Sequence, residues 1–163
     1  MVTLTEDMKR LVRQQRLGFV ATVSPDGTPN VSPKGSLTVW DDSHLVFVDI
    51  ESPNTIRNLG TNPHAEVNVV DPFTRKGFRF GGTAKVVRTG DDYWKALEMY
   101  KKEGADIRRV RAAVFVEVRT CAPLVSPVYT LGLSEDEVRR LWEEHHAKAT
   151  KKTVLDLIPP ADF

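Results

Sequence analysis

The chain has 163 residues, of which 40% are hydrophobic and 28% are charged, a composition typical of one globular domain with a sizeable core. Its formal net charge of +1 argues against a protein built chiefly to bind nucleic acid, because such proteins usually present a basic surface. The single cysteine, Cys121, excludes an internal disulfide and a four-cysteine zinc site, and the scattered histidines match no metal-binding spacing.

In the first half of the chain, apolar periodicity and turn signals predict a helix, three strands and a second helix. The first helix is amphipathic, begins near Thr5 and ends at Gly18. Strands are then expected over residues 19–23, 30–40 and 45–50, joined as an antiparallel meander. Pro33 and Gly35 interrupt the second of these strands. The second helix begins at Ser52, which is a good N-cap residue and is followed by a proline.

The second half of the chain predicts three more strands and two helices. Strands are expected over residues 65–70, 78–88 and 112–118, and helices over residues 91–103 and 134–148. The pair Gly81-Gly82 indicates a bulge or a close backbone approach, and Ser134 with Glu137 forms a capping box. Strands this short and close leave no room for parallel crossovers, so we expect a mainly β, antiparallel, closed or partly closed barrel in one domain over 1–163.

The order of several segments resembles one known family. The strand Gly18–Val23 precedes an Asp-Gly-Thr-Pro turn and a second strand through Pro33, and then come the strand Leu45–Asp49, the helix from Ser52 and the strand that enters Gly81. This ordered set covers about residues 5–120 and is similar to the pyridoxamine 5'-phosphate oxidase-like family. The resemblance implies a six-stranded antiparallel split β-barrel with peripheral helices, which holds FMN at the interface of a homodimer.

A cofactor such as FMN requires a cradle for a dianionic phosphate. The helix start offers free N–H groups, a favourable helix dipole and polar side chains at Ser52, Asn54 and Thr55. Lys34, Arg57, Arg75 and Lys76, the last followed by Gly77, are the cations expected to reach it. Taken alone, the same residues also suit a simpler interpretation, in which Ser52 only caps the helix and Lys34 is a solvated charge on an edge strand.

The flavin ring requires an apolar slot with backbone donors. The segment Ser32, Pro33, Lys34, Gly35, Ser36 interrupts a strand, and the glycine would let the backbone approach a ligand closely. An edge-strand bulge that merely protects the strand from pairing with other chains explains the segment equally well. The family places its ring against this strand, so the resemblance favours the flavin, with further contacts from Val48 and Asp49.

The function that we expect is that of an FMN-dependent oxidoreductase of unassigned substrate, with no residue singled out as catalytic. The alternatives are a flavin-binding or electron-carrying module, or a split barrel that uses deazaflavin F420 or haem. Family oxidases have Ser-Arg-Lys where this chain has residues 53–55, Pro-Asn-Thr, and the basic run from Arg108 to Arg111 defines no second cradle, so we do not expect oxidation of pyridoxamine 5'-phosphate. No apolar run has signal-peptide or membrane-span length, which predicts a cytoplasmic protein without membrane partners.

Overall fold

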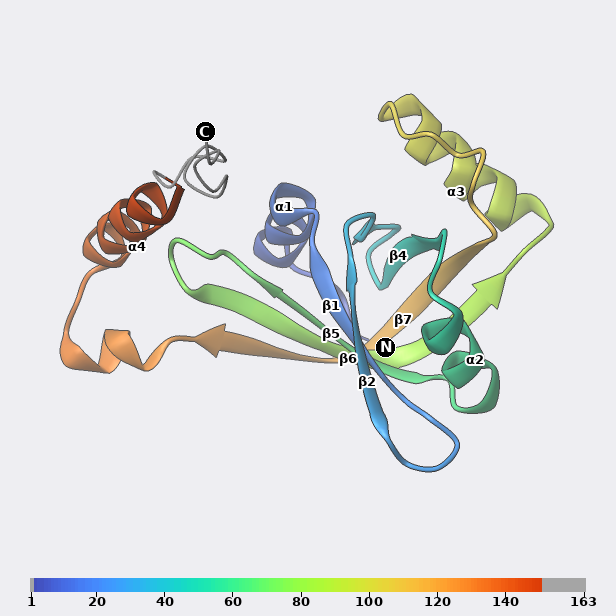
Figure 1. Ribbon diagram of the computed structural model, residues 1–163, viewed down its shortest axis with the longest axis horizontal. Helices are drawn as coiled ribbons and strands as arrows, with labels where there is room; N and C mark the ends of the chain where they lie inside the picture. The colour runs from blue at the N-terminus through green and yellow to red at the C-terminus, as the bar shows by residue number, and fades with distance from the viewer. Residues whose placement is uncertain (1, 151–163) are drawn as a thin grey trace, which may run out of the picture. The chain divides into compact units, whose positions relative to one another are not determined.

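The computed structural model describes residues 2–150 (Figure 1). Its elements are α1 (Glu6–Gln15), β1 (Gly18–Val23), β2 (Pro29–Lys34), β3 (Thr38–Val39), β4 (His44–Asp49), α2 (Pro53–Thr61), β5 (His64–Val70), β6 (Lys76–Val87), α3 (Asp91–Lys102), β7 (Ala112–Val125), the 3-10 helix η1 (Pro127–Leu131) and α4 (Glu135–Thr150). The described chain divides into two compact units, one of residues 2–70 and 77–124 and the other of residues 71–76 and 125–150. The single-domain prediction extends to residues 151–163, which lie outside the described residues, and stays a prediction.

The strands form one seven-stranded sheet in the order β2-β1-β5-β6-β7-β4-β3. The pairs β1–β2, β1–β5, β5–β6, β4–β7 and β3–β4 are antiparallel. Gly82 lies so close to the Glu117 carbonyl of β7 that a side chain there would clash, which explains the glycine pair of β6 as a close approach. The sheet, with its peripheral helices, confirms the predicted mainly β, antiparallel, partly closed barrel.

The predicted strand over residues 30–40 is in fact two strands at opposite edges of the sheet. β2 ends at Lys34 and β3 begins at Thr38, and Tyr100 of α3 donates a hydrogen bond of 2.8 Å to the Ser36 carbonyl between them. The chain therefore crosses from one edge to the other, and the sheet has seven strands rather than six. The two antiparallel pairings of the predicted meander are present, as β1–β2 and β3–β4, but they lie at opposite edges of the sheet and do not form one continuous three-stranded unit.

The hydrophobic core has two parts in the first unit. The larger fills the curled sheet beneath α1 and α2, with Phe47, Val67 and Phe80 fully buried. The smaller lies between α3 and the strands β4 and β7 and contains Tyr100 and Phe115. The helix α2 contacts β1 and β2, so the packing of the larger core places the start of α2 against the edge strand.

The edge strand β2 has reversed polarity. In its register with β1, Asn30 pairs with Thr22, Ser32 with Val20 and Lys34 with Gly18. This register puts the three polar side chains of β2 on the inner side of the sheet. Its other side chains, Pro29, Val31 and Pro33, are exposed, and Val31 is 62% exposed. A strand that packs only against a core normally has the opposite pattern, so β2 indicates a polar ligand inside and an apolar partner outside.

The end of α1 differs from the sequence expectation, whereas the start of α4 agrees with it. The helix α1 ends at Gln15, because Arg16 adopts a left-handed conformation (φ 51°) and its N–H bonds to the Val12 carbonyl. Gly18 is therefore the first residue of β1 and not the helix stop. The predicted capping box before α4 is present between Ser134 and Glu137. No helix within residues 2–150 is both long and apolar enough to span a membrane.

Candidate functional site

A cavity of about 200 Å³ lies between the inner edge of β2 and the first turn of α2. It is lined by residues 30–33 and 51–55. These include five of the residues predicted from the sequence: Ser32, Pro33, Ser52, Asn54 and Thr55. We call this cavity the cradle. The first turn of α2 has no acidic residue, but Glu51, directly before Ser52, is the charged residue in the lining of the cradle, and its carboxylate lies 3.7 Å from the guanidinium of Arg109.

Lys34 lies beside the cradle as a buried ammonium group, with the residue only 4% exposed. Its Nζ donates a hydrogen bond of 2.8 Å to the Ser32 hydroxyl and another to the Ser52 hydroxyl. Among residues 2–150 it forms no ion pair within 4.0 Å. Burial lowers the pKa of the Lys34 ammonium, and the charge of Asp49 offsets this in part. The charge of Lys34 is thus held by neutral groups and remains available to an anion.

Ser52 holds the cradle together, and the simpler interpretation of this residue and of Lys34 is wrong. Ser52 stands at the N-cap position, but its hydroxyl makes no capping hydrogen bond and instead accepts from Lys34. Its backbone N–H donates to the Asp49 carboxylate at 2.8 Å. Thr55 is 1% exposed and lines the cradle.

The segment after Lys34 is fixed from two sides. The Ser36 hydroxyl accepts from the Val48 N–H at 3.1 Å, and the Tyr100 hydroxyl holds the Ser36 carbonyl. Burial raises the pKa of Tyr100, which keeps this phenol protonated as a donor. At Gly35 a side chain would meet no atom within 4 Å, so the backbone there faces open space. Six predicted residues therefore form two hydrogen-bonded groups, one of Ser32, Lys34, Asp49 and Ser52 and the other of Ser36 and Val48.

Lys76 and Gly77 have other roles in the structure. Lys76 belongs to the second compact unit, where its Nζ lies 2.7 Å from a Glu135 carboxylate oxygen and 4.5 Å from the centre of the Tyr129 ring. The hydrogen bond to Glu135 raises the pKa of Lys76. Gly77 lies against the backbone of Val69, where a side chain would clash, so packing alone accounts for this glycine. Their part in flavin binding stays a prediction.

Four residues at or near the site were not predicted from the sequence: Thr22, Asn30, Asn58 and Tyr100. Asn30 lines the cradle, and its Nδ2 donates to the Thr22 hydroxyl at 3.2 Å. Asn58 of α2 donates to the same hydroxyl at 3.2 Å. The only signal in the sequence was that Asn30 alternates with Ser32 and Lys34, which gives a polar stripe at the spacing of one strand face.

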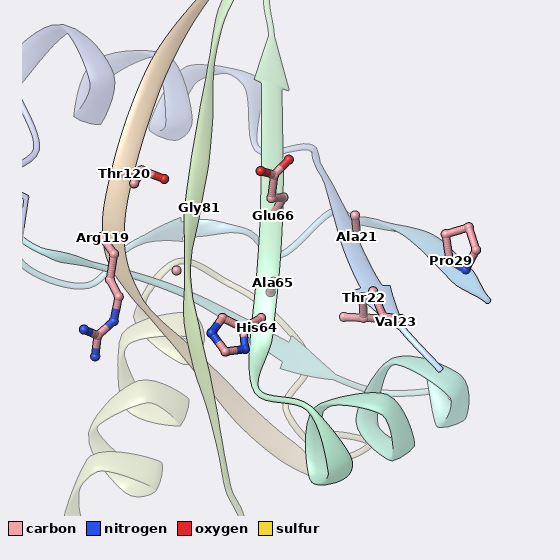
Figure 2. Close-up of a pocket in the computed structure, with 11 residues that line it drawn as sticks. Ala21, Thr22, Val23, Pro29, His64, Ala65, Glu66, Gly81, Arg119 and Thr120 are labelled. Carbon is pink, nitrogen blue, oxygen red and sulfur yellow. The ribbon is translucent and has the colours of Figure 1, made fainter. Parts of the chain in front are cut away.

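A larger cavity, of about 490 Å³, lies elsewhere on the first unit (Figure 2). It is lined by residues of β1, β5, β6 and β7 together with Pro29 of β2: Ala21, Thr22, Val23, Pro29, His64, Ala65, Glu66, Gly81, Gly82, Arg119 and Thr120. Its charged groups already have partners, since Arg119 lies 2.9 Å from Glu117 and Glu66 lies 3.6 Å from Arg79. The cradle, although smaller, therefore has the stronger claim as an anion site.

Comparisons with known proteins agree on one family. The sequence model of the pyridoxamine 5'-phosphate oxidase family matches residues 4–121. HupZ from Group A Streptococcus is 31% identical over 76% of this chain and 95% of its own, with a TM-score of 0.68. A candidate pyridoxamine 5'-phosphate oxidase from Lactobacillus delbrueckii is 27% identical over 74% of this chain and 93% of its own, with a TM-score of 0.64. An F420 reductase is 26% identical over 73% and 98%, with a TM-score of 0.56.

Two more distant structures show the shared fold alone. One is an FMN-binding protein from Syntrophomonas wolfei, 12% identical over 74% of this chain and 86% of its own, with a TM-score of 0.63. The other is the heme storage protein HutZ of Vibrio cholerae, 17% identical over 76% and 95%, with a TM-score of 0.60. By their names, proteins of this fold bind FMN, F420 or haem.

Proposed function

The chain belongs to the pyridoxamine 5'-phosphate oxidase family, and from this premise we propose that it is an FMN-binding flavoprotein that acts as an oxidoreductase. The observation that carries the proposal is Lys34, a buried ammonium with only hydroxyl partners at the edge of a cavity formed by a helix start. Asp49 offsets the cost of burying this charge only in part and forms no ion pair with it, so a ligand that brings a further negative charge would stabilise Lys34.

The residues of the cradle fit a phosphate group. Lys34 offers the charge, Ser52 and Thr55 offer hydroxyl donors, and the first turn of α2 offers backbone N–H groups. The segment that includes Gly35 and Ser36 would lie along the ring, where the open space over Gly35 lets a flat group approach the backbone. When bound, the flavin supplies the redox chemistry, and the chain positions it and limits its contact with water.

The second candidate is a protein that uses deazaflavin F420. The 26% identity with an F420 reductase favours it, and F420 also carries a phosphate group that the cradle could take. Haem is the weaker alternative, because the cradle is built to receive an anion and offers no obvious axial ligand. A flavin carrier without a substrate of its own would have the same cradle, and only activity separates it from an oxidoreductase.

We also propose that two copies of the chain associate through the outer face of β1 and β2. Phe19 is 49% exposed, Val23 is 39% exposed and Val31 is 62% exposed, and the register of the two strands puts them on one face. Val23 and Pro29 also line the larger cavity, so the apolar patch is continuous with a concave surface (Figure 2). Association through this face would bring a flavin bound near β2 close to the partner, as the family resemblance implies. A cytoplasmic location stays a prediction from the sequence.

The test is to identify the cofactor directly. The purified protein is stripped of bound small molecules and titrated separately with FMN, F420 and haem, while absorbance and flavin fluorescence are followed. We expect FMN to bind with one molecule per chain and the protein to sediment at about twice the 18.3 kDa of one chain. Binding of F420 but not FMN would select the second candidate, and binding of neither would sink the flavoprotein proposal.

A further inference from the structure

A network of three polar side chains, two of them buried, extends from the wall of the cradle to β1. The Thr22 hydroxyl on β1 accepts one hydrogen bond from Asn58 of α2 and another from Asn30 of β2, each at 3.2 Å. Thr22 is 2% exposed and Asn58 is 0% exposed, so the bond between them is shielded from water, whereas the bond from Asn30 is only partly buried. Figure 2 shows Thr22 on β1, beside Val23. One hydroxyl therefore connects three separate elements of the sheet and helix.

Both amide groups lead from Thr22 to the walls of the cradle. Asn30 itself lines one wall, on the inner face of β2. Asn58 lies three residues after Thr55, on the same face of α2, and Thr55 lines the opposite wall. The Thr22 hydroxyl thus provides a second link between β2 and α2, beside the direct hydrogen bond from Lys34 to Ser52.

The network is poorly satisfied as a purely structural feature. The Oδ1 atom of Asn58 is buried and has no hydrogen-bond partner among the described residues. A buried acceptor without a partner destabilises the fold, and a hydrophobic side chain would fill the same place without that penalty. An amide that remains at this position despite its cost is better explained by what it positions than by what it stabilises.

We propose that Thr22 is a positioning residue for the phosphate group of the cofactor. Its hydroxyl holds Asn58 and Asn30 and so sets the separation between the start of α2 and the inner face of β2. If the cradle takes the phosphate, the contribution of Thr22 is specific to ligands that carry one. The inference rests on the proposed function in one respect, namely that the cradle binds a phosphate group. It holds equally for FMN and for F420.

The test compares FMN with riboflavin, which differ only in the phosphate. In Thr22→Val the side chain keeps its shape and loses its hydroxyl. We expect the affinity for FMN to fall about tenfold, as for the loss of a buried hydrogen bond, while the affinity for riboflavin stays within about twofold. Thr22→Ser keeps the hydroxyl and should retain the parent ratio of the two affinities. An unchanged ratio in Thr22→Val, or an equal loss for both ligands, would overturn the proposal.

The matched control is Thr74→Val. Thr74 is also a buried threonine, 4% exposed, and it lies beside Asp71 in the second unit, where its backbone N–H donates to the carboxylate at 3.4 Å. This control should lose stability without any change in the ratio of FMN to riboflavin affinity. If Thr22→Val fails to fold, Thr22→Ala and Thr22→Ser give a second pair, because both lack the methyl group and only one has the hydroxyl. If neither hydroxyl-free variant folds, Thr22 is a folding residue and the proposal is wrong.

Inorganic phosphate separates this inference from the proposed function. A parent chain that does not bind FMN but melts at a higher temperature in phosphate would sink the flavoprotein proposal alone. In that case Thr22→Val should show a smaller rise in melting temperature than the parent and Thr22→Ser the same rise. A parent chain that responds to neither FMN nor phosphate would overturn both.

Discussion

Lys34 on β2 and Lys76 at the start of β6 both lie near an aromatic ring, but their electrostatic surroundings are opposite. Lys34 is 5.6 Å from the centre of the Phe47 ring, has hydroxyl partners only, and has its pKa lowered by burial. Lys76 is 4.5 Å from the centre of the Tyr129 ring, is paired with Glu135, and has its pKa raised by that hydrogen bond.

The difference shows which cation can serve a ligand. The charge of Lys76 is already matched by a carboxylate, so an anion would have to displace Glu135 to use it. The charge of Lys34 is hydrogen-bonded by Ser32 and Ser52 and only partly offset by Asp49, and an anion entering the cradle would complete its environment. The counter-charge beside a lysine, rather than the presence of the lysine, decides whether it can bind phosphate.

The largest expected effect is on turnover of pyridoxamine 5'-phosphate, which requires a second phosphate site besides that for the cofactor. It tests whether cations already paired with carboxylates can form such a site. Arg108 donates to both oxygens of Asp106, which lowers the pKa of that carboxyl to about 2, and Arg109 lies 3.7 Å from Glu51. Because these arginines resemble Lys76 rather than Lys34, we expect the FMN-loaded protein to oxidise pyridoxamine 5'-phosphate far below the enzyme median of about 10 per second. The assay supplies that substrate with oxygen and follows pyridoxal 5'-phosphate by absorbance. Turnover near the median would show that a cation already paired with a carboxylate can bind the substrate phosphate. The effect of Asp106→Asn on that turnover would then test whether Arg108 is that cation.

Replacing each of the two lysines by methionine, in separate variants, should give the next largest effect, which is a loss of FMN affinity. We expect Lys34→Met to weaken FMN binding about ten- to a hundredfold, the range for loss of a hydrogen bond to a charged group, with little change in riboflavin binding. Lys76→Met should change FMN affinity by less than about twofold, because its charge is neutralised by Glu135. Fluorescence titration of both variants measures the contrast. An equal loss of FMN affinity in the two variants would show that the two lysines do not differ in their role in phosphate binding.

The smallest effect is a pH dependence of opposite sign for the two lysines. The folded protein lowers the pKa of Lys34 below 10.5, so the unfolded chain binds more protons above that lowered pKa, and stability rises with pH up to about 10.5. The folded protein raises the pKa of Lys76 above 10.5, so its contribution is complete below 10.5 and is lost as pH rises through the folded pKa. Urea unfolding of the parent, Lys34→Met and Lys76→Met across this range measures both slopes. If the contributions of the two lysines to the free energy of unfolding changed with pH in the same direction, the opposite pKa shifts assigned to them would be wrong.

Much of the fold was predictable from the sequence, because the strands carry their own signals. The strand over residues 45–50 and the capping box of Ser134 and Glu137 depend on neighbouring residues and were predicted correctly. The division of residues 30–40 into two strands was not predictable. It depends on the bond between Ser36 and Tyr100, which are 64 residues apart, and no local pattern contains that contact.

The same limit applies to the candidate site. The helix start at Ser52 and the polar residues of β2 were predicted as one region, because the family resemblance supplied their order. The direct bond from Lys34 to Ser52, and the bond from Asn58 to Thr22 across 36 residues, come from tertiary packing. An asparagine on a short helix has the appearance of a solvated surface residue in the sequence, and only its burial shows that it belongs behind the cradle.

The bond between Tyr100 and Ser36 also bears on when during synthesis the protein can take up its cofactor. A ribosome delivers the chain from its N-terminus, so residues 30–55, which form the cradle, emerge well before α3. The segment that includes Gly35 and Ser36 acquires its fixed form only when α3 packs and Tyr100 reaches the Ser36 carbonyl. A nascent chain could therefore hold a phosphate before it can hold a ring. We expect stable loading of a flavin only after residue 100 has left the ribosome and the smaller core has formed.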